Sequence, residues 1–338
     1  MKKILPGPAH GSGAIDLHAL AIQGPDMHIL ITGANGFVGA TLARRLRTDA
    51  SAIGAWSRLT LLDLSFSDVQ TDDPRVRQLS GSLHDPGLIA QALELPVDVV
   101  FHLASVPGGL AERDYTLGRQ GNLDATQALL EALQSQDKPA RVVFASTIAV
   151  YGSPLPDVVN DATALRPQLS YATQKLIGEL LIDDFSRRGS IDGISLRLPG
   201  IVARPPQPSG LLSAFMSDVF WKLQAGAPFE CPVSPGSTAW WMSVARCVDN
   251  LVHAATLPAQ ALRARRVFAM PVLRLSMEEV IGGLQQRYGK GQVTFAPNEA
   301  LEANFGRYPA LHSEAALAIG LRHDGDLTQL IERTLGGA

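Results

Sequence analysis

Cysteine is nearly absent from this chain of 338 residues, which contains only Cys231 and Cys247. Two cysteines without CxxC spacing lack the density of a disulfide scaffold, and their plainest interpretation is two small buried hydrophobic residues. A reducing compartment fits this composition best. We therefore expect a cytoplasmic protein, and we expect no metal site.

Long apolar runs and an excess of positive charge are absent too. No apolar run approaches the roughly 20 residues that a membrane-spanning helix needs, so no membrane partner is expected. The formal net charge of −3 leaves no basic surface for nucleic acid. Prolines and glycines between Pro6 and Gly13 interrupt any apolar core of a secretory signal. We expect residues 1–26 to be an extension that is peripheral to function.

A glycine-rich loop follows the first apolar segment. His28–Thr32 predicts a short strand, and Ala40–Leu46 predicts an amphipathic helix directly after the loop. In that context the spacing GxxGxxG indicates a dinucleotide-binding site, because the helix N-terminus then faces the pyrophosphate. The residues expected to contact the cofactor here are Gly33, Asn35, Gly36, Phe37, Val38 and Gly39. A glycine-rich turn without a ligand is the alternative.

Asp63 ends the next apolar segment, Arg58–Asp63, which predicts a second strand. A carboxylate there can accept hydrogen bonds from both ribose hydroxyls of NAD, and it would repel the 2′-phosphate of NADP. The sequence therefore favours NAD, although an aspartate at the end of a strand is also a common turn former or helix cap.

A candidate catalytic group consists of Ser146, Thr147, Tyr171 and Lys175. Tyr171 and Lys175 are four residues apart and share one face of a predicted helix, while the hydroxyls of Ser146 and Thr147 follow the apolar segment Val142–Ala145. Together they could move a proton on and off an alcohol or ketone. A solvated helix face is the alternative for the Tyr/Lys pair alone.

Strand and helix patterns alternate along the first 200 residues, and this predicts an α/β fold: a doubly wound parallel sheet of the Rossmann type. Further helices are expected at Pro86–Leu93 and Leu117–Gln134, and further strands at Val97–Leu103 and Gly193–Leu198. Proline and glycine break the periodicity after Arg204. We expect an NAD-binding domain over 27–203 and mainly a smaller substrate lobe over 204–338, with 246–257 returning to the main domain.

The order of these motifs resembles the extended short-chain dehydrogenase/reductase family, also described as NAD-dependent epimerases and dehydratases. The resemblance runs from His28 to the end of the chain, strongly as far as Arg204. Within the family the chain looks most like the D-erythronate dehydrogenases. That subfamily resemblance is carried by Asn122-Leu-Asp-Ala-Thr, Val150-Tyr-Gly-Ser-Pro-Leu-Pro156, Asp161-Ala-Thr-Ala-Leu, Tyr171–Leu181 and Leu196-Arg-Leu-Pro199.

The resemblance implies further site residues. Additional contacts with NAD are expected from Ser82, Leu83, Leu103, Ala104, Tyr171, Lys175 and Pro199. Asn122 matches the asparagine that helps to hold the catalytic lysine and a water in this family. The alternative is that Asn122 only makes local hydrogen bonds within its helix. Two positions depart from the family: Ser82 replaces the usual aspartate near the adenine, and Thr147 replaces the commoner serine. Homodimers are common in the family and are expected here.

The expected chemistry is proton removal from a substrate hydroxyl by Tyr171 while NAD accepts the hydride. The charges of Lys175 and of the nicotinamide ring should lower the pKa of that phenol. Arg204 is our candidate for binding the carboxylate of a sugar acid. The alternative is that Arg204 forms a salt bridge at the surface or between domains. The loop Ser105–Gly109 should line the same pocket. His102 is expected to be a core histidine and not an acid or base.

Three functions compete. The preferred one is NAD-dependent oxidation of a hydroxyl on a small sugar acid, of the type D-erythronate to 2-dehydro-D-erythronate. The second is a nucleotide-sugar epimerase or dehydratase that keeps its NAD bound. The third is a regulator that binds dinucleotide without turnover, but proteins of that kind usually lack the Tyr/Lys pair present here. Trp240-Trp241 could be a wall of the substrate pocket or a core or subunit contact.

Overall fold

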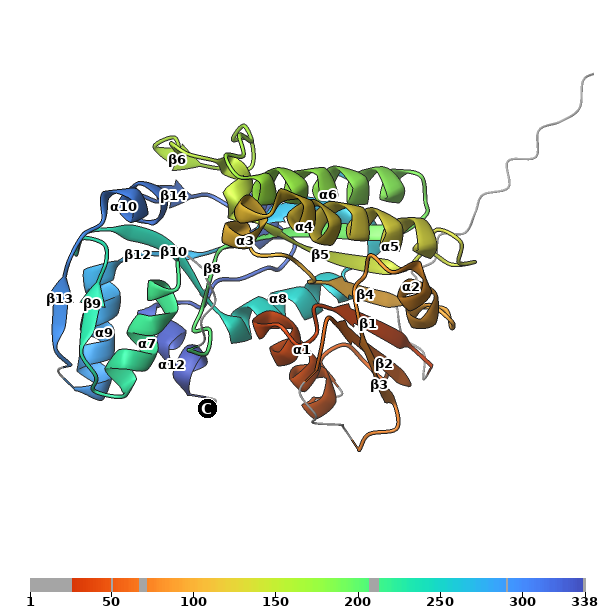
Figure 1. Cartoon of the computed structure of the whole chain (residues 1–338), viewed down its shortest axis with the longest axis horizontal. Helices are drawn as coiled ribbons and strands as arrows, with labels where there is room; N and C mark the ends of the chain where they lie inside the picture. Colours follow the sequence, from red (N-terminus) through yellow and green to blue (C-terminus); the bar gives the residue numbers. More distant parts are fainter. Residues whose placement is uncertain (1–25, 50, 67–71, 207–212, 290, 337–338) are drawn as a thin grey trace, which may run out of the picture.

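The central sheet in the described part of the chain has seven parallel strands, in the order β11-β7-β5-β4-β1-β2-β3 (Figure 1). The computed structural model describes residues 26–49, 51–66, 72–206, 213–289 and 291–336, so the expected N-terminal extension lies outside them apart from Asp26. The strands are β1 His28–Thr32, β2 Arg58–Asp63, β3 Val76–Ser80, β4 Val99–His102, β5 Arg141–Thr147, β7 Asp192–Leu198 and β11 Val267–Ala269.

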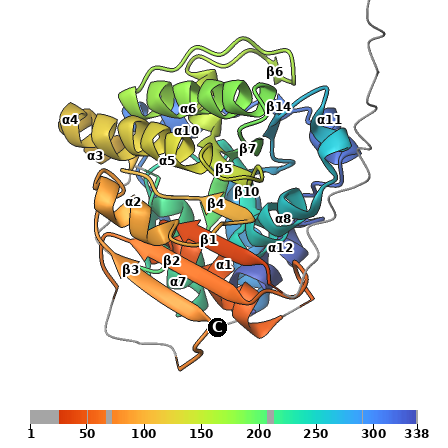
Figure 2. The same ribbon diagram turned by 90° about the vertical axis from the view of Figure 1, so that its right-hand side faces the viewer.

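Helices cover both faces of this sheet (Figure 2). They are α1 Phe37–Thr48, α2 Pro86–Ala92, α5 Ala125–Leu133, α6 Ser170–Arg187 and α8 Val244–Thr256. Side chains alternate along each strand, so Ile29 and Ile31 join the core beneath α1 and α8, whereas Leu30 joins the core beneath α2, α5 and α6. The doubly wound parallel sheet predicted from the sequence is confirmed.

The sheet order places a crevice between β1 and β4. The chain leaves β1 for β2 on one side and later returns to β4 on the other, so the connections after β1 and β4 diverge at the carboxyl edge. Ligands of open α/β sheets bind at such a switch point. The glycine loop and Ala104 lie at this edge.

The helix expected over Leu117–Gln134 is not a continuous α-helix. The chain forms α3 Gly108–Arg113, α4 Tyr115–Arg119, a π-helical turn at Gln120–Asp124, and then α5. In the wide π turn the carbonyl of Asn122 accepts a hydrogen bond from the hydroxyl of Thr126 at 2.7 Å. A π turn inside a helix often marks a functional position, and this one carries Asn122.

A smaller lobe follows β7 and contains a three-stranded sheet, β12-β10-β8, and the paired strands β9 and β13. Its elements are β8 Gly200–Val202, α7 Phe215–Gln224, β9 Phe229–Cys231, β10 Thr238–Ser243, β12 Leu273–Ser276, α9 Met277–Tyr288, β13 Val293–Phe295, α10 Glu299–Phe305 and α12 Leu327–Leu335. In Figure 1 this lobe lies to the left of the main sheet, and a hydrophobic core of its own holds it together.

The return to the main domain is longer than the 246–257 expected from the sequence. Helix α8 packs against α1, β5 and β7, and strand β11 then pairs with β7 as the edge of the large sheet. The remaining elements are the pair β6 Val158–Val159 and β14 Ala310–Leu311, helix α11 Glu314–Ala318, and 3₁₀ turns at Ile148–Tyr151 and Ala259–Leu262. Of the described helices, none combines the length and apolar character needed to cross a membrane.

Candidate active site

The glycine loop between β1 and α1 has the geometry of an anion cradle. Gly33 has a φ of +70°, and a Cβ there would lie 2.6 Å from the backbone nitrogen of Ala104. A Cβ on Gly39 would lie 2.0 Å from the carbonyl oxygen of Gly33, so helix and loop could not pack as they do. At Gly36 a Cβ would meet only that carbonyl oxygen, at 3.2 Å, which leaves this side of the loop open.

The N-terminus of α1 behind this loop has free hydrogen-bonding capacity. Gly36 is its N-cap and supplies no side-chain cap, and no acidic residue lies in the first turn. Backbone N–H groups and the helix dipole there favour an anion. The pyrophosphate of a dinucleotide fits this site, with Gly33, Asn35, Gly36, Phe37, Val38 and Gly39 around it.

Asp63 lies beside the same loop at the end of β2. Its carboxylate accepts hydrogen bonds from the backbone nitrogens of Asn35 at 2.8 Å and of Leu64 at 2.7 Å. A carboxylate has about four acceptor positions, so capacity remains for ribose hydroxyls. Ser82 is exposed, and its hydroxyl accepts a hydrogen bond from the backbone nitrogen of His84 at 3.1 Å. The side chain of Leu83 is buried in the core under α2.

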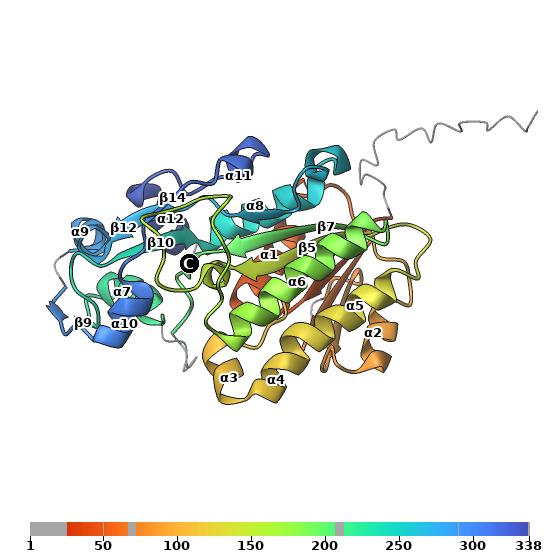
Figure 3. The same ribbon diagram turned by 90° about the horizontal axis from the view of Figure 1, so that it is seen from above.

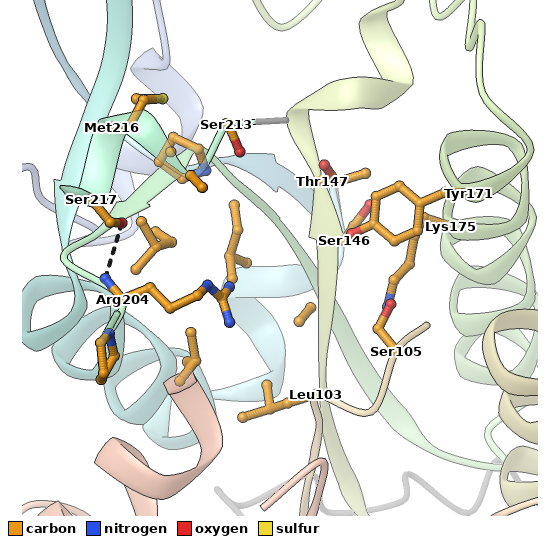
Figure 4. A pocket seen from close by; sticks show the side chains of 18 of the residues that line it. Leu103, Ser105, Ser146, Thr147, Tyr171, Lys175, Arg204, Ser213, Met216 and Ser217 are labelled. Atoms are coloured by element: carbon orange, nitrogen blue, oxygen red, sulfur yellow. Dashed lines mark hydrogen bonds between the residues drawn. The ribbon is translucent and has the colours of Figure 1, made fainter. Parts of the chain in front are cut away.

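Thr147, Tyr171 and Lys175 meet in a pocket of about 310 Å³ between the sheet edge and the smaller lobe (Figure 4). Tyr171 and Lys175 come from successive turns of α6, and Thr147 ends β5. Val38, Leu103 and Pro199, which the sequence predicts to contact NAD, also line this pocket, and so does Ser105 from the loop that follows β4. These side chains come from α1, β5 and α6 and from the loops that follow β4 and β7.

Burial dominates the protonation of this group. It raises the pKa of Tyr171, while interactions with the hydroxyls of Thr147 and Ser105 and the charge of Arg204 lower it. Burial lowers the pKa of Lys175 to about 7. The charge of Arg204 thus acts on the phenol in this structure, and the lowering expected from Lys175 and the nicotinamide ring stays a prediction. The Lys175 ammonium lies 4.7 Å from the ring centre of Phe144.

Ser146 and Thr147 have different partners because successive residues of a strand point to opposite sides. The Ser146 hydroxyl donates to the Glu179 carboxylate at 2.5 Å, and Arg197 donates to both oxygens of that carboxylate, at 2.9 and 2.7 Å. Glu179 is one turn beyond Lys175 on the same face of α6. This buried group joins α6 to β5 and β7, and it leaves Thr147 as the hydroxyl that faces Tyr171.

Arg204 enters the pocket from the lobe. Its backbone N–H donates to the Ser217 hydroxyl at 3.0 Å, and its carbonyl accepts from the Trp221 indole at 2.7 Å, so helix α7 fixes its main chain. The side chain extends across the pocket toward the wall that carries Thr147 and Tyr171 (Figure 4). Within the described residues the guanidinium forms no ion pair, and it lies 5.2 Å from the ring centre of Phe37.

The chain matches the NAD dependent epimerase/dehydratase family over residues 29–265, which is more than half of its length. It belongs to that family. The expected family and the expected cofactor, NAD, are confirmed, and the glycine loop, Asp63 and the Tyr/Lys pair all fall inside the matched region.

Three relatives of this family member are informative. D-erythronate dehydrogenase from Cupriavidus necator is 41% identical, with 90% of this chain and 97% of the relative covered. D-erythronate dehydrogenase from Haemophilus influenzae is 32% identical, with coverages of 91% and 98%. A crystal structure described as the nucleoside-diphosphate-sugar epimerase from Agrobacterium tumefaciens has a TM-score of 0.86 and 33% identity, with coverages of 98% and 99%. The resemblance to D-erythronate dehydrogenases is confirmed.

Asn122 makes contacts that the family resemblance did not predict. Its side-chain oxygen accepts hydrogen bonds from the backbone nitrogen of Val106 at 2.7 Å and from the hydroxyl of Ser105 at 3.0 Å. Its side-chain nitrogen donates to the Val106 carbonyl at 3.1 Å. Asn122 therefore holds the loop that follows β4, and through Ser105 it contacts a residue that lines the pocket. Across the described ranges no hydrogen bond joins it to Lys175.

Other residues lie away from the chemistry. His102 is fully buried between the hydroxyls of Thr32 at 2.7 Å and Thr126 at 2.9 Å, and burial lowers its pKa to about 3, which fits a core histidine. Trp240 and Trp241 are core residues and not pocket walls.

Sequence reasoning missed the lobe side of the pocket, which is lined by Ser213, Ala214, Met216, Ser217 and Asp218. No local motif marks these positions, because only the packing of α7 over the sheet edge brings them to the site.

Proposed function

We propose that this chain is an NAD-dependent dehydrogenase that oxidises the C2 hydroxyl of a small sugar acid, D-erythronate to 2-dehydro-D-erythronate. The observation that carries the proposal is a guanidinium without an acidic partner in the described chain, Arg204, which faces the hydroxyl and phenol of Thr147 and Tyr171 across one small pocket. The enzyme class agrees with the names of the two relatives described as D-erythronate dehydrogenases.

Each residue has a separate task. Arg204 would bind the carboxylate through a charge-assisted pair, and Thr147 would hold the oxygen of the reacting hydroxyl. Tyr171 would take the hydroxyl proton. NAD bound here would supply the hydride acceptor, so the alcohol would lose a hydride to it and a proton to Tyr171 and become a ketone. Because Arg204 extends toward Tyr171 across one small pocket, the carboxylate and the reacting carbon should be adjacent, as they are in a 2-hydroxy acid.

Lys175 would work together with the cofactor. Buried at the base of the pocket, it can donate to the ribose hydroxyls next to the nicotinamide, and a stronger positive charge there would favour the phenolate form of Tyr171. The glycine loop and Asp63 would hold the pyrophosphate and the adenosine ribose.

A nucleotide-sugar epimerase is the second candidate, because the Agrobacterium tumefaciens relative is described as one and the Tyr/Lys pair serves both reactions. Two observations favour the dehydrogenase. The pocket of about 310 Å³ lies at the small end of ligand sites, which range over about 300–1,000 Å³. Against the dehydratase version of this alternative, Thr147 is followed by Ile148-Ala149 and not by the acidic pair usual in dehydratases.

The test compares sugar acids with UDP-sugars in the presence of free NAD, following the absorbance of NADH. A dehydrogenase should purify largely free of nucleotide and should form one NADH for each sugar acid oxidised. Tightly bound NAD after purification, no reduction with any sugar acid and turnover of a UDP-sugar would establish the epimerase instead.

Arg204→Met, with Arg204→Lys as the matched variant that keeps the charge, tests the carboxylate site. We expect Arg204→Met to raise KM for the acid by about 100-fold, because a charge-assisted bidentate pair is lost. NAD affinity, measured by fluorescence titration, should stay within a few-fold. A large loss of NAD affinity would assign Arg204 to the cofactor, next to Phe37 at the start of α1.

The homodimer and the cytoplasmic location expected from the sequence stay predictions. Analytical ultracentrifugation of the purified enzyme would decide the first.

A further inference from the structure

Asp218 is a charged group on the lobe side of the pocket that the reaction described above does not use. It lies in the first turn of α7, is half-buried and lines the same pocket as Arg204 and Tyr171. Its carboxylate has no hydrogen bond or ion pair in the part of the chain that the structure describes. Arg204 and Asp218 are therefore two opposite charges in the lining of this pocket, and neither has an ion-pair partner among the described residues.

The two pocket walls differ in chemistry, and Figure 4 shows them facing each other. One wall carries the hydroxyl and phenol of Thr147 and Tyr171. The other belongs to the lobe, where Ser213 and Ser217 are neighbours of Asp218 in the lining. Arg204 belongs to this second wall too, so a substrate whose carboxylate is bound by Arg204 lies against the wall that also carries Asp218.

We infer that Asp218 binds the hydroxyls at C3 and C4 of the substrate, and that it thereby selects polyhydroxy acids over simple 2-hydroxy acids. This inference rests on the proposed function. A carboxylate accepts hydrogen bonds and donates none, so it matches hydroxyl donors and repels a second carboxylate. Burying a hydroxyl donor against an ionised acceptor gives a strong hydrogen bond, whereas a methyl group there would leave Asp218 desolvated without a partner.

Position in the helix offers another reason for an aspartate at 218, because acids in a first turn interact favourably with the helix dipole. That effect would contribute to stability and not to substrate choice. Glu278 occupies the corresponding region of α9, is exposed and lies outside the pocket lining. Glu278→Gln is therefore a matched control for the loss of a first-turn charge.

The experiment measures kcat/KM for D-erythronate and for 2-hydroxybutanoate of the same configuration at C2, which keeps the carboxylate and the reacting hydroxyl and lacks the other two. The wild type should prefer D-erythronate strongly. In Asp218→Asn and Asp218→Ala the ratio of the two kcat/KM values should fall by about 10- to 100-fold, because one or two charge-assisted hydrogen bonds are lost. Glu278→Gln should keep the wild-type ratio.

Other outcomes would overturn the inference. An unchanged ratio in both Asp218 variants would limit this residue to helix stability. Wild-type turnover of L-threonine that is lost in Asp218→Asn would show that the carboxylate binds an ammonium group. If the wild type reduces NAD with D-erythronate, only the role of Asp218 is at stake. If it reduces NAD with no sugar acid, the proposed function fails and this inference fails with it.

Discussion

Glu179→Ala should be among the most destabilising single substitutions in this enzyme. The Glu179 side chain is 2% exposed and that of Arg197 is 12% exposed, and the pair is bidentate, with the Ser146 hydroxyl as a third partner. Removing the carboxylate leaves the guanidinium buried, with the Tyr151 hydroxyl at 3.2 Å as its remaining side-chain partner among the described residues. Removing one partner of a buried pair typically costs about 3–5 kcal/mol.

The free energy of unfolding should be measured by urea denaturation at pH 7, and the m-value shows whether the transition stays two-state. Asp184→Ala, in the same helix, breaks exposed contacts with Arg187 and Arg188 and serves as the control, with an expected loss of less than about 1 kcal/mol.

The double variant Glu179→Met/Arg197→Met completes the test. It removes both buried charges, so it should be more stable than Glu179→Met alone. A loss in Glu179→Ala no larger than that in Asp184→Ala would refute the view that this pair fixes α6 against β5 and β7. Glu179→Ala should also lower kcat more than it raises KM for NAD, because α6 carries Tyr171 and Lys175.

Four shorter predictions concern the site itself. Tyr171→Phe should abolish turnover and leave NAD affinity within a few-fold, since the phenol acts on the substrate; retention of most of kcat would disprove its role as the base. Asp63→Ser should raise KM for NAD and reduce the difference between the KM values for NAD and NADP, whereas a wild type that already prefers NADP would show that Asp63 has been misassigned. Gly39→Ala should abolish NAD binding and lower Tm, because the new Cβ would lie 2.0 Å from the backbone oxygen of Gly33. The control Gly282→Ala should leave both unchanged, because nothing lies within 4 Å of a Cβ at that position. Burial lowers the pKa of Lys175 to about 7, so between pH 10.5 and 7 the unfolded chain takes up a proton there that the folded protein does not, and the free energy of unfolding falls as the pH decreases. In the cofactor-free protein Lys175→Met should remove that loss, so its gain in stability over the wild type should be greatest at pH 7 and absent near pH 11. An equal gain at both pH values would contradict the assignment.

The sequence alone determined the parts of this protein that depend on local spacing. Short apolar segments and helical patterns predicted β1, β2, α1 and α6, and the glycine spacing predicted the turn at Gly33, because the conformation of a tight turn depends on a few neighbouring residues. Tyr171 and Lys175 share a pocket because four residues along a helix make one turn, whatever surrounds it.

Tertiary structure decided the contacts between residues that are distant in the sequence. The sequence could not separate Ser146 from Thr147, because only the packing of α6 on β5 shows which hydroxyl faces Glu179 and which faces Tyr171. Asp218 carries no motif and reaches the site through the placement of α7. Arg204 was a candidate from its position after a strand. Its direction into the pocket, and the lack of an ion-pair partner for it among the described residues, depend on the whole fold. Spacing along the chain determines which neighbours a residue has on its own helix or strand, whereas burial and partners depend on how those elements pack.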